Sequence, residues 1–268
     1  MVERKEYLEE LKRWKEKDLI KVVTGIRRCG KSTLFDLFID YLKSIGVSEK
    51  QIIKINLEDA DYDFKDYKEL YDYIKARLIS DKMNYVFLDE VQNVPEFQRA
   101  VDSLYIKRNV DVYITGSNAY LLSGELATLL SGRYIEIKML PLSFKEYVSA
   151  FPNNNNYYQL FLEYMRNGGM PGNLSIIDTN PNDIDKYMDG IFSTIVYKDI
   201  MARNNITDKI LLESILKFIY DSIGSPISTK KISDTLTSKG MSTSNHTVEN
   251  YITAFIESFL IYKVERFD

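Results

Sequence analysis

The chain has 268 residues, of which 45% are hydrophobic and 28% charged, a composition typical of a soluble globular protein with one large domain or two ordinary ones. No apolar run approaches the roughly 18 residues that a membrane span needs, and the charged N-terminus lacks the apolar core of a signal peptide. The single cysteine excludes an internal disulfide, so we expect a cytoplasmic protein that does not contact a membrane.

The first predicted elements are a helix, a strand and a second helix. Residues 3–16 carry apolar side chains at helical spacing and predict an amphipathic helix, which either packs at the sheet edge or forms a wall beside a bound adenine ring. β-Branched residues over 19–24 predict a buried strand, and the apolar spacing over 33–42 predicts a helix.

A phosphate-binding loop is predicted between that strand and helix. Residues 25–32, Gly-Ile-Arg-Arg-Cys-Gly-Lys-Ser, match the G-x-x-x-x-G-K-S signature of a P-loop, or Walker A motif. Its two glycines let the backbone turn so that consecutive N–H groups point at phosphate oxygens, and the helix N-terminus adds partial positive charge. Lys31 is expected to reach the β- and γ-phosphates, and the Ser32 hydroxyl to bind Mg²⁺. The predicted nucleotide contacts are Gly25, Arg28, Cys29, Gly30, Lys31, Ser32 and Thr33.

Cys29 has two interpretations. It lies at a helix N-terminus beside Lys31, an environment that lowers a thiol pKa and would suit a redox switch. The favoured interpretation is that Cys29 is a tolerated filler residue.

Two adjacent acids end a later strand. A strand is first predicted over residues 51–56 and a helix over 66–80. Residues 84–90, Asn-Tyr-Val-Phe-Leu-Asp-Glu, then read as a buried parallel strand with carboxylates at its carboxyl end, the Walker B pattern. Asp89 is expected to hold Mg²⁺, and Glu90 to act as general base on the attacking water, which is typically worth about 10²–10⁴ in rate. Solvated turn residues would look the same, but the upstream P-loop favours the functional pair.

The next strand also ends in small polar residues. A helix is predicted over 95–107 and a strand over 110–118. Ser117 and Asn118 either hydrogen-bond the γ-phosphate or the attacking water, or belong to an ordinary turn. No Asn-Lys-x-Asp guanine-reading motif occurs in the chain, so ATP is favoured over GTP.

Arg133 opens a fifth predicted strand, residues 134–138. It is either a surface cation or an arginine finger donated to a neighbouring subunit of a homo-oligomer. One extra strand between the P-loop strand and the Walker B strand indicates the catalytic-glutamate branch of P-loop NTPases.

Five motifs together resemble a known family. They are Val-Thr-Gly-Ile-Arg-Arg-Cys-Gly-Lys-Ser-Thr-Leu (23–34), Leu-Asp-Glu-Val-Gln (88–92), Thr-Gly-Ser-Asn (115–118), Leu-Ser-Gly-Arg-Tyr (130–134) and Pro-Leu-Ser-Phe-Lys-Glu-Tyr (141–147). In this order they resemble the prokaryotic AAA+-related ATPases of the archaeal-type group, strongly over residues 1–150 and more weakly beyond. The resemblance implies an α/β P-loop NTPase fold with a five-stranded parallel sheet sandwiched by helices. It also implies that Asn118 or Ser117 is sensor 1, that Arg133 is the arginine finger and that Asn56 restrains Glu90.

The second half is predicted to be helical. Helices are expected over 143–150, 157–167, 183–202, 208–222, 228–237 and 245–258, with a strand beginning at 260–264. Ser228 and Ser244 precede helices as N-caps do, and the glycine-rich segment 168–172 is expected to be a turn. Arg166 or Arg203 is a candidate for the sensor-2 arginine that AAA+ lids usually carry.

Three domains are predicted: an AAA+-like core (1–150), a helical lid or linker (151–205) and a winged-helix-like region (206–268). The sequence ends where the wing hairpin would return, and relatives usually continue into a further domain. We therefore expect a truncated or shortened product.

A nucleic-acid role is weakly supported by the charges. The net charge is −4, and the predicted recognition helix, residues 245–257, contains no lysine or arginine, although phosphate contacts normally supply much of the affinity. Base contacts by Ser242, Thr243, Asn245 or His246 remain one possibility, and a protein partner is the other.

These observations favour a Mg²⁺-dependent ATPase whose hydrolysis of ATP to ADP and phosphate drives a conformational switch. The alternative is a nucleotide-gated module that docks on DNA or protein and has negligible hydrolysis. A small-molecule kinase is a third possibility, but the pair Asp89 and Glu90 argues against it.

Overall fold

One parallel sheet organises the first half of the chain. The computed structural model describes residues 2–118, 130, 132–177 and 180–265. The sheet contains β1 (Ile20–Thr24), β2 (Ile52–Asn56), β3 (Asn84–Asp89), β4 (Val110–Gly116) and β5 (Tyr134–Lys138). All four strand pairs are parallel and the order is β2-β3-β4-β1-β5. The α/β P-loop NTPase fold with a five-stranded parallel sheet is therefore confirmed.

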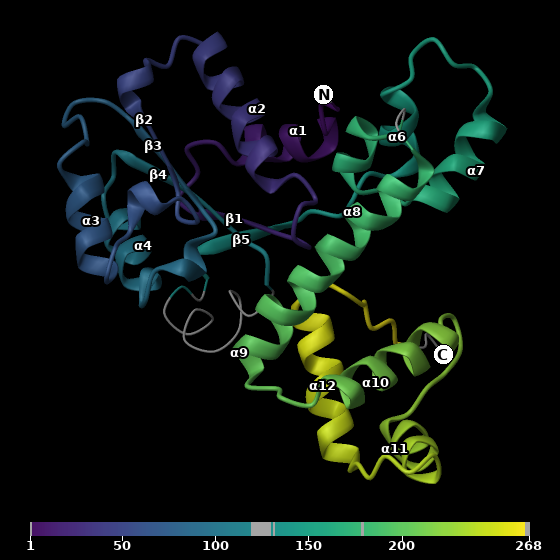
Figure 1. Ribbon diagram of the computed structural model, residues 1–268. Helices are drawn as coiled ribbons and strands as arrows, with labels where there is room; N and C mark the ends of the chain where they lie inside the picture. The colour runs from purple at the N-terminus through teal and green to yellow at the C-terminus, as the bar shows by residue number, and fades with distance from the viewer. Residues whose placement is uncertain (1, 119–129, 131, 178–179, 266–268) are drawn as a thin grey trace. The chain divides into compact units, whose positions relative to one another are not determined.

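Helices cover both faces of the sheet (Figure 1). Helices α1 (Lys5–Trp14) and α2 (Lys31–Ser44) lie on one face, and α3 (Tyr67–Lys75) and α4 (Phe97–Tyr105) lie on the other. Short 3₁₀ turns, η1 (Glu49–Gln51), η2 (Ala60–Tyr62) and η3 (Val91–Asn93), join these elements.

The strand residues explain the layers because alternate side chains point to opposite faces. Val86 and Leu88 of β3 belong to the aliphatic core against α3 and α4. Phe87 points the other way, where its ring stacks on Tyr113 at 4.7 Å and meets Phe35 of α2 edge-on at 5.2 Å. Strands buried on both faces read as continuous apolar runs for this reason.

The strand register brings the predicted site together. Thr24 of β1 pairs with Gly116 of β4, and Leu88 of β3 pairs with Ile114, so Asp89 follows at the level of Thr115. The carboxyl ends of β1, β3 and β4 therefore meet at one edge of the sheet, where open α/β sheets bind their ligands.

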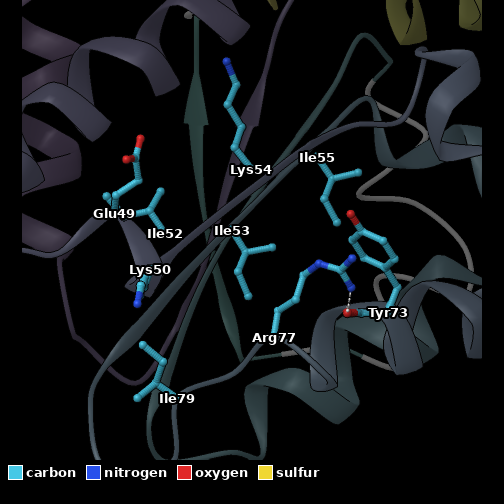
Figure 2. Close-up of a pocket in the computed structure, with 9 residues that line it drawn as sticks. All are labelled: Glu49, Lys50, Ile52, Ile53, Lys54, Ile55, Tyr73, Arg77 and Ile79. Atoms are coloured by element: carbon cyan, nitrogen blue, oxygen red, sulfur yellow. Dashed lines mark hydrogen bonds between the residues drawn. The ribbon is translucent and has the colours of Figure 1, made fainter.

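A groove follows the free edge of β2 (Figure 2). It has a volume of about 430 Å³ and is lined in part by Ile52 and Ile55 of β2 and by Tyr73 of α3. Arg77 lies over the Tyr73 ring, 3.4 Å from its centroid, and donates a 2.8 Å hydrogen bond to the Tyr73 carbonyl. None of the predicted nucleotide-binding or catalytic residues lines this groove.

The chain divides into two units, residues 1–187 and 188–268. After the sheet, the first unit contains α6 (Phe144–Ser149), α7 (Tyr157–Asn167), the 3₁₀ segment η5 (Pro171–Ser175) and the start of α8 (Pro181–Thr194). The second contains a π-helical segment, η6 (Ile195–Met201), α9 (Ala202–Asn204), α10 (Lys209–Asp221), α11 (Thr229–Ser238) and α12 (Asn245–Glu257). The finer division at residues 150 and 205 stays a prediction.

The helical C-terminal region is confirmed, but its predicted strand is wrong. Ser228 and Ser244 cap α11 and α12 by accepting hydrogen bonds from the third residue along. Residues 260–264 form no strand. Phe259 has a φ of +57°, and Leu260 N donates a 3.0 Å hydrogen bond to Phe255 O, so the backbone folds back over the end of α12.

Two further expectations fall partly outside the described residues. Ser131 of the fourth motif and the last residues, 266–268, are among those not described.

Among the described residues, no helix has the length and apolar character needed to cross a membrane.

Candidate nucleotide-binding site

The loop after β1 has the backbone that its glycines predict. Gly25, Arg28 and Gly30 all have positive φ angles, of 153°, 64° and 104°. A Cβ atom on Gly25 would lie 2.2 Å from the carbonyl oxygen of Met139, so the residue after β1 must be glycine. Gly30 is the N-cap of α2, which places the next residues in its first turn, with free N–H groups available to an anion.

Lys31 lies inside this loop. Its side chain is 3% exposed, and Nζ donates hydrogen bonds to the carbonyl oxygens of Gly25 at 3.1 Å and Ile26 at 3.4 Å. Nζ also lies 3.3 Å from Oε1 of Glu90. The predicted phosphate-binding lysine and the predicted general base therefore form an ion pair across the site.

Thr115 holds both acids at the end of β3. Asp89 and Glu90 are 3% and 7% exposed. The Thr115 hydroxyl donates to Asp89 Oδ1 and accepts a 2.9 Å hydrogen bond from the Glu90 backbone N–H. The sequence signal for this role was only a polar residue at the end of an apolar strand, and Thr115 was not among the predicted site residues.

The two acids have opposite pKa shifts. Burial raises the pKa of Asp89, and hydrogen bonds from Ser32 and Thr115 offset only part of that rise. Burial acts in the same direction on Glu90, but the charge of Lys31 and a hydrogen bond from Gln92 outweigh it and hold the pKa of Glu90 below its usual range. Glu90 is thus an ionised base, whereas burial disfavours the charged form of Asp89, which a bound cation would stabilise.

These donors fit a Mg²⁺ ion bound together with phosphate. Ser32 and Asp89 offer a hydroxyl and a carboxylate, the hard oxygen ligands that Mg²⁺ takes from proteins. Among the described residues, no group of three or more His, Cys, Asp or Glu side chains forms a closed metal site. A magnesium ion at Asp89 would therefore need oxygens from phosphate and water as well.

The residues after β4 also reach the site. Ser117 N donates a 3.2 Å hydrogen bond to Oε2 of Glu90, and Ser117 and Asn118 are 1% and 2% exposed. Ser117, one of the two predicted sensor residues, therefore contacts the predicted general base, and Asn118 follows it in the chain.

Arg133 lies away from the site of its own chain. Arg133 precedes β5, which runs parallel to β1. It therefore lies near the amino ends of these strands, whereas the P-loop follows the carboxyl end of β1, about 16 Å away over five residues of strand. Its guanidinium pairs with Asp102 of α4. A role as arginine finger can only be in trans, and it stays a prediction.

Asn56 does not restrain Glu90. Its side chain is exposed, and Oδ1 accepts a 3.1 Å hydrogen bond from Glu58 N. Gln92 contacts Glu90 instead, with Nε2 2.5 Å from Oε2. The physical reason is that Gln92 follows the acid in the same turn, whereas Asn56 lies on the neighbouring edge strand.

The structure favours one of the two interpretations of Cys29. The thiol is fully buried, 3.6 Å from the Met139 carbonyl oxygen to which it donates. Burial raises the pKa of the Cys29 thiol and outweighs the opposing charges of Lys31 and Arg4. The expected lowering of this pKa is wrong, which leaves the filler interpretation.

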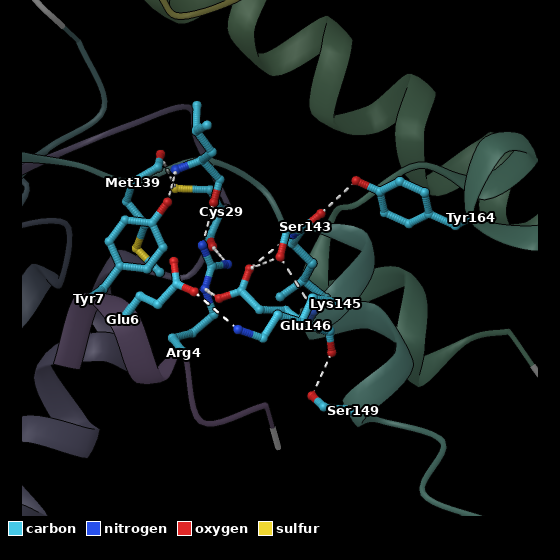
Figure 3. Close-up of polar contacts among 12 residues, drawn as sticks. Arg4, Glu6, Tyr7, Cys29, Met139, Ser143, Lys145, Glu146, Ser149 and Tyr164 are labelled. Atoms are coloured by element: carbon cyan, nitrogen blue, oxygen red, sulfur yellow. Dashed lines mark hydrogen bonds and ion pairs between the residues drawn. The ribbon is translucent and has the colours of Figure 1, made fainter. Parts of the chain in front are cut away.

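A buried arginine, Arg4, links the P-loop to the segment after β5 (Figure 3). Arg4 is 3% exposed and donates from Nη1 to the Cys29 carbonyl at 3.2 Å and from Nη2 to the Leu140 carbonyl. Its Nε lies 2.9 Å from Oε1 of Glu146, which also caps α6 through Ser143. The sequence gives no signal for this role, because Arg4 lies in a charged N-terminal run that looks solvated.

The glycine-rich segment 168–172, predicted only as a turn, contacts the chain around the P-loop. A Cβ on Gly169 would lie 2.4 Å from the Leu142 carbonyl oxygen, and Leu142 N donates a 2.7 Å hydrogen bond to Gly169 O. Pro171 Cγ would lie 3.8 Å from a Cβ on Gly30. This segment therefore packs beside the P-loop.

Comparisons with known proteins agree with this architecture. A family model described as an AAA domain matches residues 17–148, and one described as a domain of unknown function matches residues 158–268. An uncharacterized protein of Haemophilus influenzae is 40% identical over 273 residues, which cover 100% of this chain and 68% of that protein. An uncharacterized protein of Methanocaldococcus jannaschii is 30% identical over 266 residues, which cover 92% of this chain and 57% of that protein.

A solved structure shares the fold. A Walker-type ATPase of Pyrococcus abyssi has a TM-score of 0.63 at 17% identity, over 96% of this chain and 90% of that one. From the matched AAA domain and the Haemophilus influenzae relative, we conclude that the chain belongs to the family of AAA-domain P-loop ATPases.

Proposed function

We propose that this chain binds ATP with Mg²⁺ and hydrolyses it to ADP and phosphate, and that the reaction drives a conformational switch. The observation that supports this best is the contact between Lys31 of the P-loop and Glu90, an ionised base directly after the candidate metal ligand Asp89. A phosphate-binding loop and a base at one sheet edge are the parts that hydrolysis needs.

Each part has a defined role in the proposed reaction. The loop N–H groups and Lys31 bind the phosphates, and Ser32 and Asp89 would hold Mg²⁺, which neutralises charge on the β- and γ-phosphate oxygens when bound. Glu90 takes a proton from the attacking water while the new O–P bond forms. The bond from the γ-phosphorus to the bridging oxygen breaks, and ADP leaves with the electron pair of that bond.

A nucleotide-gated binding module is the second candidate. It is favoured by the engagement of Glu90, whose carboxylate contacts Lys31, Gln92 and Ser117 N at once. A base held in this way would turn over slowly until binding of ATP or of a partner draws Lys31 away.

Partners outside the nucleotide site also remain proposals. Arg133 would complete the site of a second copy in a homo-oligomer, and the C-terminal helices would bind DNA or protein. Of the candidate base contacts, Asn245 already accepts a hydrogen bond from Ser233 of α11, and His246 is within 3.3 Å of Asn250. These internal contacts favour a protein partner over base recognition.

Phosphate release from ATP with Mg²⁺ tests the proposal, using wild type, Lys31→Ala and Glu90→Gln over a range of protein concentrations. We expect turnover that rises more than linearly with concentration and is lost in both variants, while Glu90→Gln still binds ATP. Bound ATP without turnover in the wild type would favour the binding module.

A further inference from the structure

Three groups from different segments orient the Glu90 carboxylate. Lys31 Nζ lies 3.3 Å from Oε1, while Ser117 N and Gln92 Nε2 donate to Oε2 at 3.2 Å and 2.5 Å. Lys31 has an assigned partner in the phosphate, and Ser117 contributes through its backbone. Gln92 is the only one of the three whose side-chain contact with Glu90 has no role in the proposed reaction so far.

The turn that contains Gln92 does not need its side chain. Backbone hydrogen bonds from Asn93 N to Glu90 O, at 3.2 Å, and from Val94 N to Val91 O, at 3.1 Å, close η3. A residue without an amide would form the same turn, so the turn does not explain why an amide side chain contacts Glu90.

The two ends of that amide have different surroundings. The NH₂ group of Gln92 faces Glu90, because Nε2 donates its hydrogen bond to Oε2 of that carboxylate. The opposite atom, Oε1, is buried and has no hydrogen-bond partner among the described residues. A buried acceptor without a partner is unfavourable, and such a group is tolerated when it serves a ligand.

A second buried atom without a partner belongs to the same cluster. Ser117 Oγ also has no hydrogen-bond partner among the described residues, and the N–H of Ser117 contacts the same oxygen of Glu90 as Gln92 does. Two residues that bind Glu90 Oε2 thus each carry one buried polar atom without a partner among the described residues.

We propose that Gln92 is a positioning residue for the attacking water, an inference that rests on the proposed ATP hydrolysis. Nε2 fixes Oε2 of Glu90, and Oε1 accepts one hydrogen of the water whose other hydrogen is bonded to Glu90. The water oxygen then directs a lone pair at the γ-phosphorus. As the new O–P bond forms, the proton passes to Glu90, the bond to the bridging oxygen breaks and ADP leaves.

The test compares Gln92→Met, which keeps the length of the side chain without hydrogen bonding, with Asn93→Ala at an exposed position in the same turn. Single-turnover rate and ATP affinity are measured for each variant, and the thermal midpoint confirms folding. We expect the rate of Gln92→Met to fall about 10–100-fold with unchanged ATP affinity, and Asn93→Ala to match the wild type.

A third measurement separates positioning from a structural effect. Because Gln92 acts through Glu90, Gln92→Met should cause little further loss in a Glu90→Gln background. The inference is overturned alone if wild type hydrolyses ATP and Gln92→Met stays within twofold of it, loses rate and affinity equally, or adds its full loss to Glu90→Gln. Wild type that binds ATP but releases no phosphate overturns both the inference and the proposed function.

Discussion

Lys31 and Glu90 pair at 3.3 Å, although each has its own task in the proposed hydrolysis of ATP. Both side chains are less than a tenth exposed, so each charge depends on the other in the nucleotide-free chain. A bound γ-phosphate would compete for Lys31 and would leave Glu90 more basic. In the proposed reaction, nucleotide binding and activation of Glu90 as the base are therefore coupled through Lys31.

Removal of the lysine should therefore destabilise the chain as well as abolish nucleotide binding. Lys31→Met leaves a buried carboxylate without its cation, and we expect the free energy of unfolding to fall by about 3–5 kcal/mol. Denaturant unfolding without nucleotide measures this loss. Glu90→Gln in the same chain should recover most of it, and a double variant as unstable as Lys31→Met would contradict the pairing.

Loss of the Thr115 hydroxyl should affect both acids. Thr115→Val keeps the shape of the side chain but leaves the Glu90 N–H unsatisfied and removes a donor from Asp89. We expect a loss of about 1–3 kcal/mol in stability and a clear decrease in the rate of phosphate release. Thr115→Ser retains the hydroxyl and is the matched control, expected close to the wild type in both measurements.

The raised pKa of Asp89 predicts a pH-dependent penalty in the metal-free chain. When a carboxyl group has a higher pKa folded than unfolded, its favourable contribution is complete below the unfolded pKa and is lost as the pH rises through the folded pKa. Asp89→Asn should therefore raise the thermal midpoint near pH 7 without Mg²⁺, with a difference that disappears toward acidic pH.

The exposed variant Asp40→Asn serves as the control for that measurement and should show no such pH-dependent gain. Asp89→Asn should also lose the stabilisation that wild type gains from Mg²⁺ with ATP. A variant no more stable than wild type at pH 7 would show that the Ser32 and Thr115 hydrogen bonds fully compensate the buried charge.

Arg4 should contribute to both stability and nucleotide affinity. Arg4→Met removes the donors to the Cys29 and Leu140 carbonyls and leaves Glu146 without its cation, for an expected loss of about 3 kcal/mol. ATP affinity should fall too, because the hydrogen bond from Arg4 to the Cys29 carbonyl holds the P-loop backbone in place. Arg13→Met, which breaks an exposed pair with Glu10, should change stability by less than about 0.5 kcal/mol.

The sequence by itself determined the fold class and indicated the residues proposed for the centre of the site. The P-loop motif predicts a strand, a turn and a helix N-terminus within about fifteen residues. Asp89 and Glu90 come at the end of the apolar strand β3, a pattern typical of a buried parallel sheet. These signals are local, so periodicity and motif spacing were enough to single out Lys31, Ser32, Asp89 and Glu90, which the structure brings together. The C-terminal helices were found in the same way, from apolar spacing and N-cap residues.

Only the tertiary structure decided which distant residues complete the site. Arg4 meets Cys29 and Leu140 across 25 and 136 residues of sequence, and no local pattern marks such contacts. Sheet register decided that Thr115 lies beside Asp89. Strand direction placed Arg133 at the amino ends of the strands, away from the P-loop. Burial, which a sequence does not state, raised the pKa of Cys29 where the helix N-terminus suggested the opposite.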